Sequence, residues 1–134
     1  METLNLEKLE IKEEKGTFFI PKVNFDPITG TCELSGESYL EDTWQFYEKL
    51  INWLKTYTSA GTLPIEFKIK LAYYNTSSSK SIVDILKLLK NYQETGAPVN
   101  VKWYYLEDDE DSLMDAEDMI ADTGIEMDLI AYDE

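Results

Sequence analysis

Two segments of the chain repeat apolar residues at helical spacing. They cover residues 41–61 and 81–96, and a glycine ends each of them. Asp42 or Thr43 can cap the start of the first. Residues 111–124 are predicted to form a third, shorter and acidic helix. The apolar stripe of the first helix comprises Trp44, Tyr47, Leu50, Ile51, Leu54 and Tyr57.

Five further segments are predicted to be strands, because they are short, apolar or alternating, and bounded by turn residues. The first two flank a turn that contains Pro27 and Gly30, which predicts an N-terminal β-hairpin. Pro21 interrupts the first of them and should therefore lie at a sheet edge. The predicted strands are residues 17–25, 31–36, 64–74, 97–107 and 125–132.

Strands and helices alternate after the hairpin, an order that implies right-handed parallel crossovers. The expected fold class is α/β, a single domain with three helices and one open, mixed but mostly parallel sheet of about five strands. The first hairpin strand should be antiparallel at one side. Residues 1–16 are charged and are expected to form an N-terminal arm that can include a short strand near residues 9–11. Residues 17–134 are expected to form the domain.

Composition narrows the class of function. The chain has 134 residues and a formal net charge of −15, so a basic protein patch is an expected partner, whereas nucleic acid and anionic membrane are not. The absence of histidine excludes Ser-His-Asp and Cys-His catalysis. Cys32, the single cysteine, cannot form an internal disulfide and is expected in the core. A cytoplasmic location is expected, because no secretory signal and no apolar run of about 18 residues is present.

Clustered carboxylates do not indicate a metal or acid–base site. The acidic stretch at residues 106–122 lacks the glycine that the turn of an EF-hand loop needs, so a solvated helix face is expected there. Glu37 and Asp42 have no recognisable substrate pocket around them and are expected to be a surface residue and a helix cap.

The stretch YYNTSSSK, residues 73–80, places hydroxyl and amide side chains between a predicted strand and a predicted helix. Ser77 and Lys80 match the S-x-x-K pattern of serine–lysine acyl enzymes, but the accompanying S-D-N and K-T-G elements are missing. Asn75, Thr76 and Ser77 fit a glycosylation acceptor, which has no use without a secretory signal. Neither match is a strong indication of function.

Two other interpretations of this stretch remain open. Asn75 or Thr76 can cap the following helix, a contribution of about 1 kcal/mol. Alternatively, a phosphate on Thr76 would lie at a helix N-terminus, where the dipole and free N–H groups favour anions. Lys80, one turn further along, can then pair with that phosphate.

Three longer segments, LSGESYLEDTWQFYEKLINWL, LAYYNTSSSKSIVDILKLL and VKWYYLEDDEDSLMDAEDMI, resemble the SiaC-type bacterial regulatory phosphoproteins, relatives of the STAS-domain anti-anti-sigma factors. The motifs S-G-E-S-Y and Y-x-N-T-S-S-x-K occur in the same order, and the similarity spans residues 17–132. Leu40 stands where the family pattern has a proline. That departure affects loop detail.

The resemblance implies a STAS-like fold and a non-enzymatic role without a cofactor. It implies that Thr76 is phosphorylated by a partner-switching kinase and dephosphorylated by a metal-dependent phosphatase. The unphosphorylated form would bind and activate a diguanylate cyclase, raising cyclic di-GMP and favouring biofilm. An unregulated or anti-anti-sigma-like scaffold is the alternative. The expected partner-binding residues are Asn75, Ser77, Ser78, Lys80, Glu37, Ser38 and Tyr39.

Overall fold

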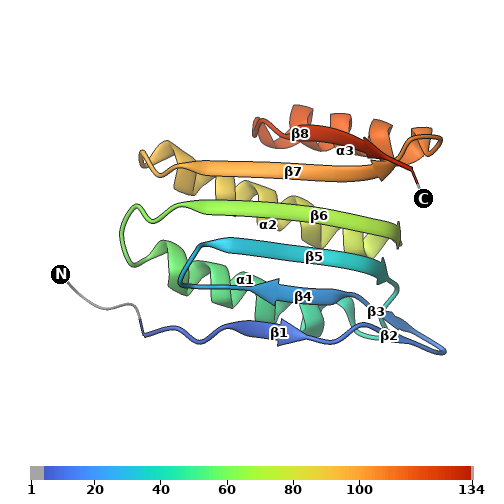
Figure 1. The fold of residues 1–134 in the computed structure, drawn as a ribbon, viewed down its shortest axis with the longest axis horizontal. Coiled ribbons are helices and arrows are strands. Elements are labelled where there is room, and N and C mark those ends of the chain that lie inside the picture. The colour runs from blue at the N-terminus through green and yellow to red at the C-terminus, as the bar shows by residue number, and fades with distance from the viewer. Residues whose placement is uncertain (1–4, 134) are drawn as a thin grey trace.

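A six-stranded sheet runs through the molecule in the order β1-β4-β5-β6-β7-β8 (Figure 1). The computed structural model describes residues 5–133, so residues 1–4 of the expected arm and residue 134 of the expected domain lie outside the described residues. Strands β5 to β8 are parallel, and β1 and β5 flank β4 antiparallel to it. The strands are β1 Leu9–Ile11, β4 Lys22–Phe25, β5 Thr31–Ser38, β6 Ile65–Tyr74, β7 Val99–Leu106 and β8 Asp128–Tyr132.

The expected mixed α/β architecture with three helices is confirmed, with one more strand in the sheet than predicted. The additional strand is β1, the short strand expected near residues 9–11 of the arm, and it pairs with β4 in the main sheet. Pro21 is not at an edge of this sheet. It is buried between β3 (Phe19–Ile20), which pairs with β2 (Glu14–Lys15), and β4 of the main sheet. Because proline has no N–H to donate to a ladder, the chain passes from one sheet to the other there.

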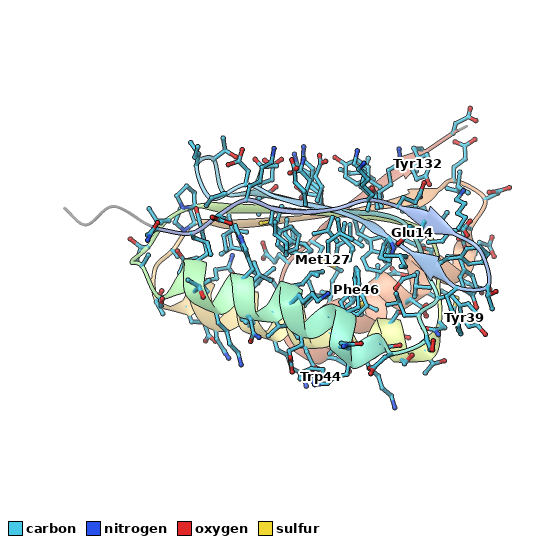
Figure 2. The ribbon with its side chains drawn as sticks, turned by 90° about the horizontal axis from the view of Figure 1, so that it is seen from below. Glu14, Tyr39, Trp44, Phe46, Met127 and Tyr132 are labelled. Carbon is cyan, nitrogen blue, oxygen red and sulfur yellow. The ribbon has the colours of Figure 1, made fainter. Side chains whose placement is uncertain are left out.

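All three helices cover the same face of the sheet, as Figure 2 shows from the side. They are α1 (Thr43–Thr58), α2 (Thr76–Glu94) and α3 (Glu110–Thr123). The parallel strands follow one another in chain order, and right-handed crossovers that always advance in one direction leave every helix on one side. The opposite face of the sheet is therefore uncovered by helices.

The core between sheet and helices is dense in aromatic rings. Phe25 packs edge-on against Trp53 of α1 and Phe67 of β6, with ring centroids 5.3 and 5.5 Å apart. Cys32 is fully buried, and burial raises the pKa of its thiol. Trp103 is also buried, and its indole N–H donates to the Ser112 hydroxyl at 3.0 Å. These contacts join β4, β6 and β7 to the helical layer.

The turn between β4 and β5 depends on a glycine. Gly30 has φ +77°, and a Cβ added there would overlap the carbonyl oxygen of Pro64 and lie 2.7 Å from the Tyr57 hydroxyl. That hydroxyl donates to the same carbonyl at 2.7 Å. The Gly30 carbonyl itself accepts from the Glu66 N–H at 3.0 Å. A side chain at this position would therefore separate the hairpin turn from the start of β6.

We expect Gly30→Ala to destabilise the domain by about 3 kcal/mol, combining left-handed backbone strain with a clash against fixed backbone. Gly124→Ala is the matched control, since Gly124 has φ +76° and its added Cβ meets nothing closer than Lys90 Cε at 3.7 Å. The control should cost about 1 kcal/mol. Urea unfolding of both variants measures the difference, and equal losses would show that the close approach to Pro64 is unimportant.

Candidate functional site

The start of α2 is built by Asn75 and displays Thr76. The Asn75 side chain accepts a hydrogen bond from the Ser78 N–H at 3.0 Å. The backbone carbonyl of Asn75 accepts one from the Ser79 N–H, also at 3.0 Å. Thr76 is the first helical residue and is exposed. The helix begins five residues before its apolar period, which starts at residue 81, and of the two predicted caps it uses Asn75.

A cluster of buried hydroxyl groups lies directly beneath this helix start. The Ser38 hydroxyl, at the end of β5, is 2.8 Å from both the Tyr47 hydroxyl of α1 and the Ser78 hydroxyl of α2. All three residues are fully buried. Burial raises the pKa of Tyr47 to about 12, although the two serines oppose the shift, so the phenol is neutral at physiological pH. We call Ser38, Tyr47 and Ser78 the hydroxyl cluster.

The prediction that Ser38 and Ser78 contact a partner is corrected by this burial. Neither side chain has any solvent exposure, so both act by holding the ends of β5 and α2 together. The Asn75 N–H adds a third link, since it donates to the Ser38 carbonyl at 3.2 Å. The sequence placed Tyr47 on the apolar stripe of its helix and gave no sign that its hydroxyl enters this cluster.

The starts of α1 and α2 are joined at the surface. The hydroxyls of Thr43 and Ser77 lie 2.9 Å apart, and Ser77 also donates to the Asn75 side chain at 3.3 Å. Asp42 caps α1 by accepting from the Gln45 N–H at 3.0 Å, as one of the two predicted caps. Thr43, the other predicted cap, instead contacts Ser77, a contact that the sequence did not predict. The presence of polar residues at the starts of both helices could have indicated this contact.

The remaining predicted contacts lie near Thr76 at the surface. Tyr39 is 40% exposed, and its ring is 6.5 Å from that of Tyr73. Glu37 is half-buried beside a bulge at the end of β5, and Lys80 is exposed on α2. Figure 2 shows Tyr39 at the same end of the molecule as the start of α1. The hydrogen bond from the Asn75 N–H to the Ser38 carbonyl places the end of β5, just before Tyr39, beside the start of α2.

The chemistry available at this surface is that of an acceptor hydroxyl. Helix geometry leaves the first N–H groups of α2, including those of Thr76 and Ser77, without intrahelical acceptors. Ser77 bonds to Thr43 and Asn75, and among residues 5–133 it has no hydrogen bond to Lys80. In the same part of the chain, no three carboxylate or cysteine side chains converge to hold a metal ion. None of the helices described there is long and apolar enough to cross a membrane.

Comparison with known proteins gives consistent results. A model of SiaC family regulatory phosphoproteins matches residues 11–132. An uncharacterized protein of Pseudomonas aeruginosa (strain UCBPP-PA14) is 32% identical over 119 residues, which cover 89% of this chain and 94% of the relative.

Solved structures share the fold as well. Apo-SiaC of Pseudomonas aeruginosa superposes with a TM-score of 0.82 at 30% identity, covering 94% of this chain and 100% of that one. A chain in the crystal structure of the diguanylate cyclase SiaD in complex with its activator SiaC matches with a TM-score of 0.81 at 30% identity, covering 91% and 100%. The resemblance inferred from the motifs is confirmed. The chain belongs to the SiaC family of regulatory phosphoproteins.

Proposed function

We propose that this chain is a non-enzymatic signalling module that binds and activates a diguanylate cyclase, and that phosphorylation of Thr76 switches the binding off. The observation that carries the proposal is the placement of Thr76, an exposed hydroxyl at the first position of a capped helix. The related SiaC is the activator in a complex with the cyclase SiaD. A protein kinase would transfer the phosphoryl group, and a metal-dependent phosphatase would hydrolyse it.

The start of α2 suits a phosphate physically. The N–H groups of Thr76 and Ser77 lack intrahelical acceptors, and the helix dipole favours negative charge there. Lys80 lies one turn further along the helix and is exposed, so its ammonium group can approach the phosphate. A phosphothreonine carries nearly two negative charges at neutral pH. Its presence would change the charge and shape of this surface without a change in fold.

The partner surface in this proposal is the exposed rim around Thr76. It includes Asn75, Ser77 and Lys80 from the start of α2, together with Glu37 and Tyr39 from the end of β5 and the loop after it. The hydroxyl cluster beneath fixes the two segments relative to each other. A phosphate in the middle of this rim would obstruct a partner that fits the unmodified surface, so the unphosphorylated form is the binding form.

An unregulated scaffold, with the loop serving only as a cap, is the alternative. The structure gives the capping role to Asn75, which leaves the exposed Thr76 hydroxyl outside the cap. The acyl-enzyme alternative requires Lys80 to activate Ser77, whose observed hydrogen bonds go to Thr43 and Asn75 instead. These observations favour the phosphorylation switch.

The first test is phosphopeptide mass spectrometry of the protein from its native cells, on the peptide spanning residues 71–80. We expect phosphate on Thr76. In cells that lack the native gene, Thr76→Ala should keep cyclic di-GMP high, whereas Thr76→Glu should weaken cyclase binding about tenfold, or ~1.4 kcal/mol, and lower cyclic di-GMP. Ser77→Ala is the control and should still accept phosphate at Thr76. Normal cyclase binding by Thr76→Glu, or phosphate that never appears on Thr76, would contradict the switch.

A second test concerns the ionisation of the phosphate itself. The ordinary second pKa of phosphothreonine is about 6. Lys80 and the helix dipole stabilise the dianion, so the pKa should lie below that value. Lys80→Gln should raise it by about 0.3 units, the size of an i,i+4 ion pair. Phosphorus NMR titration of the phosphorylated protein measures this shift. Lys87→Gln is the control, because Lys87 lies almost two helical turns beyond Lys80 and should not affect the phosphate pKa. An equal shift in both variants would exclude a local ion pair between Lys80 and the phosphate.

A further inference from the structure

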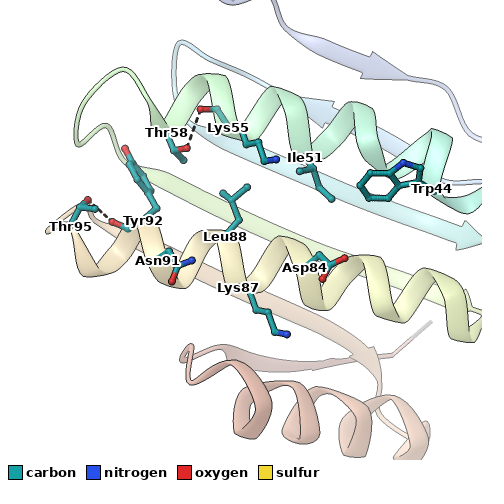
Figure 3. Close-up of a pocket in the computed structure, with 10 residues that line it drawn as sticks. All are labelled: Trp44, Ile51, Lys55, Thr58, Asp84, Lys87, Leu88, Asn91, Tyr92 and Thr95. Atoms are coloured by element: carbon teal, nitrogen blue, oxygen red, sulfur yellow. Dashed lines mark hydrogen bonds between the residues drawn. The ribbon is translucent and has the colours of Figure 1, made fainter.

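A groove of about 590 Å³ runs between α1 and α2 on the side away from the sheet (Figure 3). Trp44, Ile51 and Leu88 supply its apolar surface, with Trp44 at one end. Lys55 of α1 reaches over the groove. Asp84 and Lys87 of α2 line the other wall, and the Lys87 ammonium extends toward the α3 side of α2. The side chains of the two helices form the two walls of the groove.

Trp44 is unusual among the tryptophans of this chain. It is 56% exposed, whereas Trp53 and Trp103 are 6% and 1% exposed. A large aromatic ring that a folded domain leaves in solvent at the end of an apolar groove is typical of a binding anchor. The neighbouring residue, Thr43, contacts Ser77 at the start of α2. The groove therefore leads to the Thr76 surface.

The charge of the groove differs from that of the whole protein. Against a net charge of −15, α1 carries two lysines and one glutamate, α2 carries three lysines and two carboxylates, and α3 carries six carboxylates and no lysine. Within residues 5–133, the lysines that form ion pairs are Lys8, Lys68 and Lys102. No carboxylate in this part of the chain lies within ion-pair distance of Lys55 or Lys87. Two lysines of the groove are thus available to a ligand.

We infer that this groove binds an amphipathic helix of a partner protein, with apolar residues seated against Trp44 and Leu88 and acidic residues facing Lys55 and Lys87. A helix fits because the groove lies between two helices and offers no strand edge for backbone pairing. The α1 wall from Trp44 to Thr58 is about 21 Å long, which about four helical turns would span. The net charge of −15 alone predicts a basic partner, whereas the occupant proposed for this groove is acidic.

An acidic occupant also explains how a phosphate would act at a distance. Thr76, Lys80, Asp84, Lys87 and Asn91 follow one another at spacings of three and four residues and so share one side of α2. A phosphate on Thr76 would place negative charge at the end of the groove and repel acidic side chains entering there. This part of the inference rests on the proposed phosphorylation of Thr76, whereas the groove itself does not.

The test uses two stapled helical peptides of about four turns. Both carry leucines at helical spacing, with glutamates at the flanking positions of one and lysines at those of the other. Each is titrated into the full chain while the Trp44 indole signal and backbone amide shifts are followed by NMR. We expect the acidic peptide to bind about tenfold more tightly, with shifts confined to α1 and α2. If the overall net charge of −15 determined binding, the basic peptide would bind more tightly.

Matched variants separate the groove from general charge. Lys55→Glu with Lys87→Glu should weaken the acidic peptide about tenfold, and Trp44→Ala should do the same. Lys49→Glu is the control because Lys49 lines a different hollow of α1, beside Phe46, and it should change binding less than about twofold. Equal loss in Lys49→Glu, tighter binding of the basic peptide, or no groove shifts with the acidic peptide would each overturn the inference.

Two further outcomes are informative. If the free protein dimerises in sedimentation experiments with shifts at Trp44, the groove belongs to a second copy and the inference is wrong. Thr76→Glu should weaken the acidic peptide about threefold and leave a glutamine-flanked peptide unaffected. If the peptide binds but Thr76 is never phosphorylated, the phosphorylation switch is wrong and the binding groove is supported. If Thr76 is phosphorylated but no peptide binds, the groove inference is wrong and the switch is supported.

Discussion

The buried hydroxyl cluster is the interaction on which the geometry of the surface around Thr76 depends. Ser38, Tyr47 and Ser78 come from β5, α1 and α2, and each hydroxyl finds its partners within the cluster. A buried hydroxyl without a partner costs about 1–3 kcal/mol, so the three elements are stabilised in the one arrangement that satisfies all of them. That arrangement holds Thr76 outward and sets the starts of α1 and α2 side by side, where Thr43 meets Ser77.

The distribution of charge follows from the one-sided covering of the sheet. The uncovered face carries alternating charges, with Lys68 between Glu33 and Glu66 and Lys102 beside Glu66. These pairs are partly exposed and contribute little stability, but they neutralise that face. The excess of carboxylates lies elsewhere, with six in α3. The groove between α1 and α2 differs from both surfaces. It is an apolar channel bordered by Asp84 and by Lys55 and Lys87, two lysines that form no ion pair within residues 5–133.

Local patterns predicted most of the fold and little of the site. The helices and parallel strands followed from periodicity, because each buries one regular face. Strand β1 is three residues long, and its pairing with β4 is a long-range contact that no local pattern carries. The apolar period of α2 begins only at residue 81, because the serines before it show none, and the earlier start follows from the interpretation of Asn75 as a cap. The hydroxyl cluster joins residues 9 and 40 positions apart, and a tyrosine in an apolar stripe does not reveal where its hydroxyl points.

The separation of cap and acceptor constrains how a switch at this site can work. A phosphate on the capping residue itself would alter the bonds that begin the helix and would couple modification to local unfolding. Here Asn75 makes those bonds and Thr76 follows it on the outer surface. In the proposed switch, modification of Thr76 would therefore leave the cap and the hydroxyl cluster intact. A partner would distinguish two rigid surfaces that differ in one charged group, and its discrimination must come from electrostatics and fit rather than from an order–disorder transition.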